Sequence, residues 1–122
     1  MLHTVGLVIS WIVSLGIIGI GMAYWRRSES NAVGFGLPVL PHPEARGWWQ
    51  VKGIRDIGSG LIVIVMIFAA PAALGWVILV EAIIPLGDAV LVLANGGRRS
   101  VAFGVHGATS VAMMLAAAML LI

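Results

Sequence analysis

Four apolar stretches, separated by polar or turn-forming residues, account for most of the sequence. A helix needs about 20 predominantly apolar residues to cross the hydrocarbon core of a bilayer. The stretches that approach this length cover residues 4–25, 51–70, 73–94 and 100–122. They predict an all-α, integral membrane four-helix bundle, in which residues 1–122 form a single membrane domain.

Residues 26–50 interrupt this pattern with charged residues, glycines and prolines. Pro38, Pro41 and Pro43 cannot donate a helical hydrogen bond, so they argue against a continuous helix. We therefore predict a long loop between the first two spans, and loops of this length are often functional lids or disordered segments. Much shorter breaks, at residues 71–75 and 95–97, separate the remaining spans.

The positions of the basic residues predict how the spans are oriented. All seven lysines and arginines lie in or beside two segments, residues 26–55 and 98–99. Segments rich in Lys and Arg stay in the cytoplasm, so we expect a cytoplasmic 26–50 loop and both termini outside. The first stretch has no positive residues before it and is followed by Arg26 and Arg27, which is typical of a retained span rather than a cleaved signal peptide.

The composition supports a location in the cell membrane, with lipids as the main partners. Only 10% of the residues are charged and 61% are hydrophobic, whereas a soluble domain carries about 25% charged residues. The sequence lacks a dense basic run, which argues against nucleic-acid binding. It has no cysteine and only three scattered histidines. We therefore expect no thiolate site, no metal site and no bound cofactor.

Ionisable residues within the predicted spans are the main candidates for chemistry. Such residues are costly in a membrane and mostly face the interior of a bundle. With a rise of about 1.5 Å per residue, Asp56, Asp88 and His106 lie at a similar depth, roughly 8–10 Å inside the cytoplasmic end. They come from three different spans, and Arg55 directly precedes Asp56. We predict that these four residues form one site.

A second set of polar residues lies deeper or on neighbouring faces. Glu81 lies about 10 Å beyond Asp88 along the third span and on the same face, since seven residues make about two helical turns. Pro85, between them, cannot donate a hydrogen bond to the carbonyl of Glu81, which predicts a kink. The secondary candidates for the site are Glu81, Ser59, Thr109 and Ser110.

Each of these residues also has a purely structural interpretation. Arg55 and Asp56 could lie at the interface, with the Arg55 side chain extending to the headgroups. Asp88 and Arg55 could form a structural ion pair within the membrane. His106 alone could be a hydrogen-bonded packing residue.

Two motifs resemble those of a known family of small four-helix membrane proteins. The first is Gly-x-Arg-Asp at residues 53–56, at the end of the polar stretch 48–56 that leads into the second span; the second is Pro-x-x-Asp at residues 85–88. A histidine near the start of the last span accompanies them. The family is classified only as a domain of unknown function, and the resemblance extends from about Gly34 onward. It implies the four-helix architecture and that Arg55, Asp56, Asp88 and His106 act together; Glu81 lies outside the motifs.

The residue types at this depth favour an intramembrane acid–base enzyme acting on a lipophilic small molecule. We expect Asp56 and Asp88 to be the acid–base pair, Arg55 to orient one of them and His106 to shuttle protons. Epoxide opening, isomerisation and cyclisation all need such a pair and no cofactor. In residue types alone, the set resembles the Asp-Arg-Asp arrangement of limonene-type epoxide hydrolases, which have an unrelated soluble fold.

Two other classes of function remain open from the sequence. A small proton-coupled transporter or exporter could relay protons through Glu81 and Asp88, although small multidrug exporters place their key acid in the first helix, which here has none. A non-catalytic membrane subunit could use the charges for assembly alone. A homo-oligomer is compatible with each of these functions.

Overall fold

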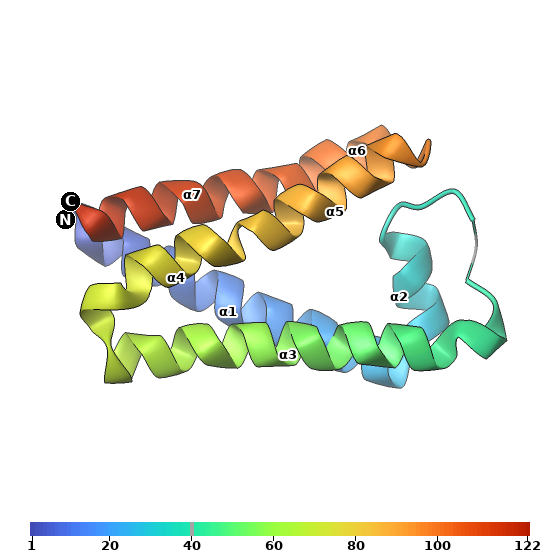
Figure 1. The fold of residues 1–122 in the computed structure, drawn as a ribbon, viewed down its shortest axis with the longest axis horizontal. Helices are drawn as coiled ribbons and strands as arrows, with labels where there is room; N and C mark the ends of the chain where they lie inside the picture. Colours follow the sequence, from blue (N-terminus) through green and yellow to red (C-terminus); the bar gives the residue numbers. More distant parts are fainter. Residues whose placement is uncertain (40) are drawn as a thin grey trace.

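The computed structural model describes residues 1–39 and 41–122, and all the regular structure in them is helical (Figure 1). The predicted all-α class is therefore confirmed. Four long helical segments run side by side, and two of them are composite. They are α1 (Leu2–Arg26); α3 (Arg46–Ala69); α4 (Leu74–Glu81) with α5 (Ile83–Ala94); and α6 (Arg99–Val101) with the π-helical η3 (Ala102–Gly107) and α7 (Ala108–Leu121).

Part of the segment predicted as a loop is helical. It contains α2 (Ser28–Gly34) and the short η1 (Pro43–Ala45), and α3 begins at Arg46, before the expected start near residue 51. Side chains explain the tight turn into α2. The Ser28 hydroxyl donates to the carbonyl of Tyr24 (2.6 Å), and the Asn31 amide donates to the carbonyls of Ala23 (3.1 Å) and Arg27 (2.8 Å). These bonds satisfy the last carbonyls of α1, which have no partner within the helix.

The third helical segment is bent where the proline predicted it. The break falls at Ala82, between α4 and α5, and Figure 1 shows the two helices running at an angle. Pro85 provides no N–H for the carbonyl of Glu81, which weakens the helix at this point. The Ser110 hydroxyl of α7 donates to the neighbouring carbonyl of Ala82 (2.9 Å) and so ties the bend to the last helix.

Close helix crossings hold α1 against α3. A Cβ atom on Gly21 would lie 2.5 Å from the carbonyl oxygen of Gly53, and one on Gly53 would lie 2.6 Å from that of Gly21. Only glycine permits this approach, which is common where helices pack in membranes. Further along the same pair, Gly60 has equally little space beside the Ser14 carbonyl.

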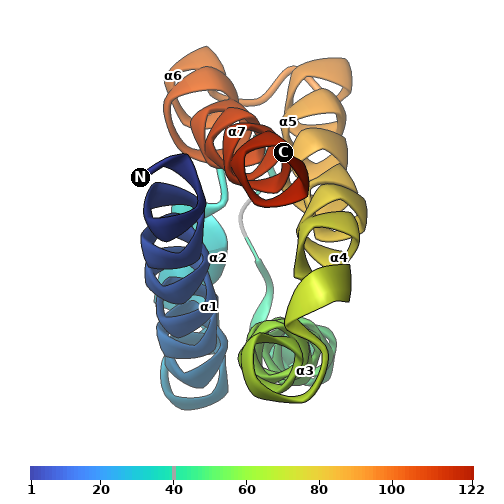
Figure 2. The same ribbon diagram turned by 90° about the vertical axis from the view of Figure 1, so that its left-hand side faces the viewer.

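The apolar core occupies the half of the bundle near the termini, which lie together at one end (Figures 1 and 2). It joins α3, α4 and α7 and has one buried member in the turn between α4 and α5. Its buried members are Val63, Leu74, Ile78, Ala82, Met113, Ala116 and Ala117. In the other half, α5 packs against η3 and α7 and diverges from α3 (Figure 1).

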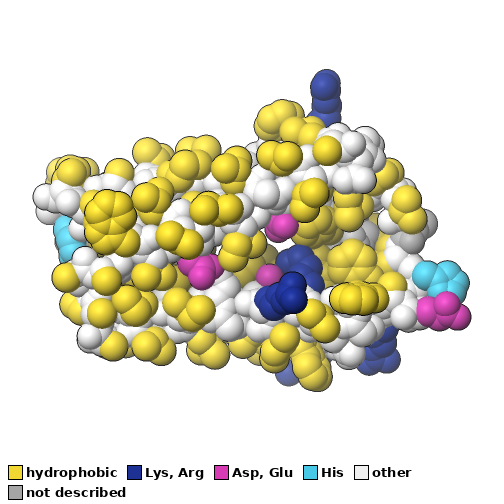
Figure 3. All heavy atoms as spheres, in the orientation of Figure 1, with side chains coloured by type: hydrophobic (Ala, Val, Ile, Leu, Met, Phe, Trp, Pro, Cys, Tyr) yellow, Lys and Arg dark blue, Asp and Glu magenta, His cyan; other side chains and the backbone are white. Residues whose placement is uncertain are grey.

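Three helices among the described residues are long and apolar enough to cross a membrane: Leu2–Arg26, Pro71–Ala94 and Arg99–Leu121. α3 has a similar length of 24 residues, but its first half carries Arg46, Lys52, Arg55 and Asp56. Figure 3 shows one face of the bundle on which hydrophobic side chains predominate; acidic and basic side chains gather at a hollow near its middle, and further charged or histidine side chains lie toward the ends. The fold therefore combines a lipid-compatible surface with a local concentration of charge.

Candidate functional site

Asp56 of α3 is paired with a lysine on its own helix. The Lys52 ammonium lies 2.7 Å from Asp56 Oδ2, and the Asp56 side chain is only 8% exposed. The two residues are four apart, so their side chains share one helix face. The ammonium also lies 4.8 Å from the ring centre of Tyr24 and 5.5 Å from that of Phe35, within cation–π range. Lys52 is thus held in place by a carboxylate and two aromatic rings.

Asp88 of α5 faces His106 of η3. The His106 Nδ1 atom lies 3.8 Å from Asp88 Oδ2, and its Nε2 atom lies 3.0 Å from the carbonyl oxygen of Phe35. A carbonyl can only accept a hydrogen bond, so Nε2 carries the hydrogen and Nδ1 faces the carboxyl group. At 3.8 Å the imidazole and the carboxyl do not bond directly, but a small rotation or one water molecule can join them.

The backbone around His106 has an unusual form. η3 is a π-helix of six residues, and short π-helical segments within α-helices are frequent at functional sites. The π-helical turn alters which way the residues of this segment point, compared with a regular α-helix. It presents the His106 side chain toward Phe35 and Asp88.

Phe35 lies close to both Lys52 and His106. Its ring lies 4.7 Å from the His106 ring and within cation–π range of Lys52. Asp88 is also close enough to Asp56 and Lys52 to interact electrostatically with both. We refer to the group as the acid–base cluster; its members are Tyr24, Phe35, Lys52, Asp56, Asp88 and His106. Tyr24 lies in α1, and Phe35 directly follows α2. The other members come from α3, α5 and η3.

The position of Phe35 is fixed by contacts between two distant segments of the chain. Arg98 donates from its guanidinium to the carbonyl of Val33 (2.7 Å) and from its backbone N–H to the carbonyl of Gly36 (2.8 Å). Gly36 has a φ of 101°, a conformation that favours glycine. Gly97 packs so closely on Gly36 that no Cβ would fit there. The Phe35 carbonyl is therefore held against His106 by rigid backbone.

The structure places Arg55 away from the cluster. Its side chain is exposed, and it makes no ion pair within residues 1–39 and 41–122. Adjacent residues on a helix point about 100° apart, so Arg55 and Asp56 cannot share a face. The prediction that Arg55 orients an aspartate thus differs from the observed geometry, in which Lys52 contacts Asp56. The four-residue spacing of Lys52 and Asp56 was the signal in the sequence; nothing there indicated Tyr24 or Phe35.

Among the secondary candidates, Ser59 and Glu81 contact each other. The Ser59 hydroxyl of α3 donates to the Glu81 carboxylate at the end of α4, so Glu81 is not an isolated acid. Ser110 bonds the carbonyl of Ala82, and the Thr109 hydroxyl donates to the Val105 carbonyl of its own helix (2.8 Å). Glu81 and Ser59 therefore extend the polar face of α3 deeper into the bundle, whereas Thr109 is engaged locally.

Nothing in the described part of the chain groups three His, Asp or Glu side chains closely enough to hold a metal ion. Figure 3 shows acidic and basic side chains at a hollow near the middle of one face. The cluster contains two carboxyl groups. Asp56 lies next to the cationic Lys52, and Asp88 lies next to His106, which can carry a proton. Such groups can take up and release protons at two neighbouring points.

A comparison with protein families covers the whole cluster. The model described as "Domain of unknown function (DUF4267)" matches residues 14–121. The chain belongs to this family. The resemblance noted from the sequence, to a family classified only as a domain of unknown function, is therefore confirmed. No curated protein and no solved structure matches the chain.

Proposed function

We propose that this DUF4267 protein is an intramembrane acid–base enzyme that acts on a lipophilic small molecule without a cofactor. The observation that carries the proposal is the pairing of Asp56 with Lys52 and of Asp88 with His106, with the Phe35 ring near both Lys52 and His106. Charged groups in a membrane are costly and usually serve a function. Two pairs at one place exceed what helix packing needs.

In the proposed topology, four segments cross the membrane, including α3, and both termini lie outside. The arginines support it, because they cluster at the end of the bundle that contains α2 and the 95–98 turn. The opposite end, with both termini and η2 (Pro71–Ala73), has no lysine or arginine. The positive-inside rule then places the α2 end in the cytoplasm. In α3, the ion pair between Lys52 and Asp56 reduces the cost of inserting two charges.

The two carboxyl groups suit different roles. Asp56 accepts a hydrogen bond from Lys52, the geometry of a carboxylate that can remove a proton from water or from a carbon acid. Asp88 and His106 Nδ1 face each other while Nε2 donates to Phe35, so a proton between them can pass to a substrate oxygen. In epoxide hydrolysis, water attacks a ring carbon and loses its proton to Asp56, the C–O bond breaks, and Asp88 or His106 protonates the oxygen.

Lateral access from the bilayer supports a lipophilic substrate. The hollow of Figure 3 lies on a face where hydrophobic side chains predominate, and Figure 1, in the same orientation, shows α5 diverging from α3. A hydrophobic molecule dissolved in the bilayer reaches the carboxyl groups without crossing water. Isomerisation and cyclisation use the same two groups, with Asp56 removing a proton and the Asp88–His106 pair supplying one.

The proposal is tested by turnover of a panel of lipophilic epoxides and alkenes by purified protein in liposomes, with products identified by mass spectrometry. We expect Asp56→Asn and Asp88→Asn each to lower turnover by about 10²–10⁴-fold, the usual contribution of a general acid or base. Lys52→Gln should have a large effect, whereas Arg55→Gln, the exposed neighbour and matched control, should retain most of the activity. Equal losses in Lys52→Gln and Arg55→Gln would contradict the assigned roles.

A second candidate, a proton-coupled transporter, is favoured by the contact between Ser59 and Glu81. Lys52, Asp56 and Ser59 follow one face of α3 and end at Glu81, which makes a polar track into the bundle. Proton-coupled flux in liposomes that is abolished by Glu81→Gln, with no turnover of any substrate, would establish transport instead. Misassembly of the Asp56, Asp88 and Glu81 variants alike would favour a non-catalytic subunit.

A further inference from the structure

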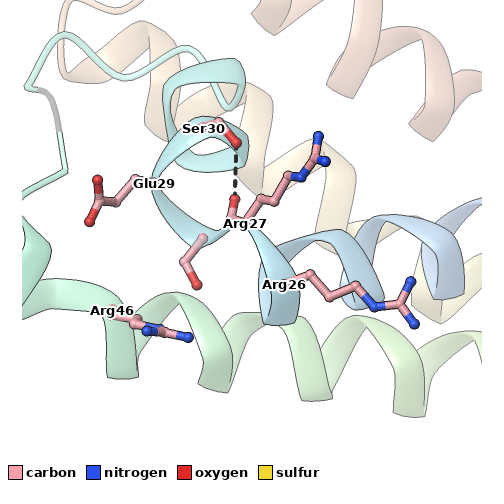
Figure 4. A pocket seen from close by; sticks show the side chains of 6 residues that line it. Arg26, Arg27, Glu29, Ser30 and Arg46 are labelled. Atoms are coloured by element: carbon pink, nitrogen blue, oxygen red, sulfur yellow. Dashed lines mark hydrogen bonds between the residues drawn. The ribbon is translucent and has the colours of Figure 1, made fainter.

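A basic pocket lies at the α2 end of the bundle, apart from the acid–base cluster (Figure 4). It is an open surface depression with a volume of about 340 Å³. We refer to it as the arginine pocket; its lining residues are Arg26, Arg27, Ser28, Glu29, Ser30 and Arg46. They come from the end of α1, the start of α2 and the first residue of α3.

The pocket has unneutralised positive charge. It contains three arginines and one acid, Glu29, whose carboxylate points away from Arg26 and Arg27 in Figure 4. None of the three arginines forms an ion pair with any side chain in the described ranges. The Ser28 and Ser30 hydroxyls donate to backbone carbonyls, of Tyr24 and Arg27 respectively, so the guanidinium groups are the available donors.

Helix stability does not explain Arg46. It is the first residue of α3, and a positive charge at a helix N-terminus is unfavourable because of the helix macrodipole. No acidic residue stands in the first turn of α3 to offset it. Arg26, at the C-terminal end of α1, is favourable to its helix by the same rule. Arg46 is therefore a cation without an acidic partner in its own helix turn, and it is available to bind an external anion.

The surroundings indicate where that anion comes from. Trp25 directly precedes Arg26, and Trp48 lies two residues after Arg46. Both tryptophans are exposed. Exposed tryptophans are typical of the membrane–water interface, at the depth of the lipid headgroups. Arginine forms paired, charge-assisted hydrogen bonds with phosphate oxygens, and basic pockets on the cytoplasmic side of membrane proteins bind anionic headgroups.

We propose that the arginine pocket binds the phosphate group of an anionic lipid headgroup. The guanidinium groups of Arg26, Arg27 and Arg46, which all line the pocket, supply the donors. This site is independent of the proposed catalytic function, because none of its residues belongs to the acid–base cluster. A bound lipid also joins the end of α1 to the start of α3.

The test is calorimetric titration of the purified full-length protein, in a neutral detergent at physiological ionic strength, with two probes: short-chain phosphatidic acid and inorganic phosphate. We expect saturable binding of phosphatidic acid and at least tenfold weaker binding of inorganic phosphate, which lacks the acyl chains that an interfacial site also contacts. Arg46→Gln and Arg27→Gln should each weaken lipid binding by about tenfold or more, as expected for loss of a charge-assisted hydrogen bond.

Arg99→Gln is the matched control. Arg99 lies at the same end of the bundle, at the start of α6, but does not line the pocket. The same loss of one charge there should change lipid binding by less than about twofold, because Arg99 does not line the pocket and salt screens exposed charges. Equal weakening by Arg46→Gln and Arg99→Gln would overturn the proposal in favour of general surface attraction. Equal binding of inorganic phosphate and phosphatidic acid would overturn it in favour of a soluble anion.

Folding of the variants is checked by their helical circular dichroism and thermal unfolding. Arg27 and Arg46 are exposed, and Arg46→Gln removes an unfavourable charge at a helix N-terminus, so we expect native stability. Turnover by the acid–base cluster should be retained in both variants. Loss of lipid binding with retained turnover thus separates this site from the proposed catalytic one.

Discussion

The two halves of the bundle are built on opposite principles. Near the termini, α4 and α7 close on each other around Leu74, Ile78 and Ala116, which are at most 1% exposed. Near α2, α5 diverges from α3 (Figure 1), and this half contains the pairs of Asp56 with Lys52 and of Asp88 with His106. The first half shows that this chain packs well without charge. The proposed function gives the charges of the second half a role that assembly of the first half does not need.

The sharpest test of this contrast is Lys52→Met. It leaves the Asp56 carboxylate without its partner in a nearly buried position, and breaking a buried pair in this way destabilises by about 3–5 kcal/mol. Replacing both members, as Lys52→Met with Asp56→Leu, should restore most of the stability, since an apolar pair fits the same environment. Unfolding in mixed detergent micelles measures both. Arg55→Met, the exposed control, should stay within about 0.5 kcal/mol of the native protein.

In the apolar half, Leu74→Ala should destabilise by about 2 kcal/mol or more, because it opens a cavity in a core that has no polar group to hydrate. Turnover per folded molecule should be unchanged, since Leu74 lies in the half opposite the cluster. Leu79→Ala is the control: Leu79 is on the same helix but exposed, and its truncation should have little effect on unfolding. A loss of turnover in Leu74→Ala at full folding would mean that the halves are coupled.

Gly97→Ala tests whether backbone packing positions the cluster. A methyl group there meets the carbonyl of Gly36, and overpacking of this kind costs about 1–3 kcal/mol. The displaced 33–36 segment should move the Phe35 carbonyl away from His106. Turnover per folded molecule should therefore fall, in addition to the loss of stability. Gly104→Ala, also near this end of the bundle but with no neighbouring atom in reach, should leave both unchanged. Similar behaviour of the two variants would contradict the positioning role.

The smallest effect is expected at the bend between the halves. Ser110→Ala removes the hydrogen bond to the Ala82 carbonyl, and side-chain hydrogen bonds between membrane helices contribute about 0.6 kcal/mol on average. Thr109→Ala removes only a bond within its own helix and should cost less. The difference between the two variants in thermal unfolding measures how firmly the bend is attached to α7.

The helical class and the kink near Pro85 follow directly from the pattern of apolar residues and from proline geometry. The depth argument also selected Asp56, Asp88 and His106, because a rise per residue fixes depth without any knowledge of packing. It could not choose between Arg55 and Lys52, since that choice depends on which face of α3 turns inward. The role of Phe35 depends on the contact of residues 33–36 with the 97–98 turn, which is remote in sequence. The π-helical form of η3 likewise leaves no pattern in the residue types.

The central claim is that the carboxyl groups of the cluster are reachable from the bilayer. It is tested by treating native membranes with dicyclohexylcarbodiimide, a hydrophobic reagent that modifies carboxyl groups, and locating the adducts by mass spectrometry. Glu29 and Glu44, which are exposed outside the spans, serve as controls for a water-soluble carbodiimide. We predict modification of Asp88, whose side chain is 24% exposed, and its suppression by an excess of lipophilic epoxide. An absence of adducts on both Asp88 and Asp56, with the controls fully reactive, would show a closed structural core and contradict the claim.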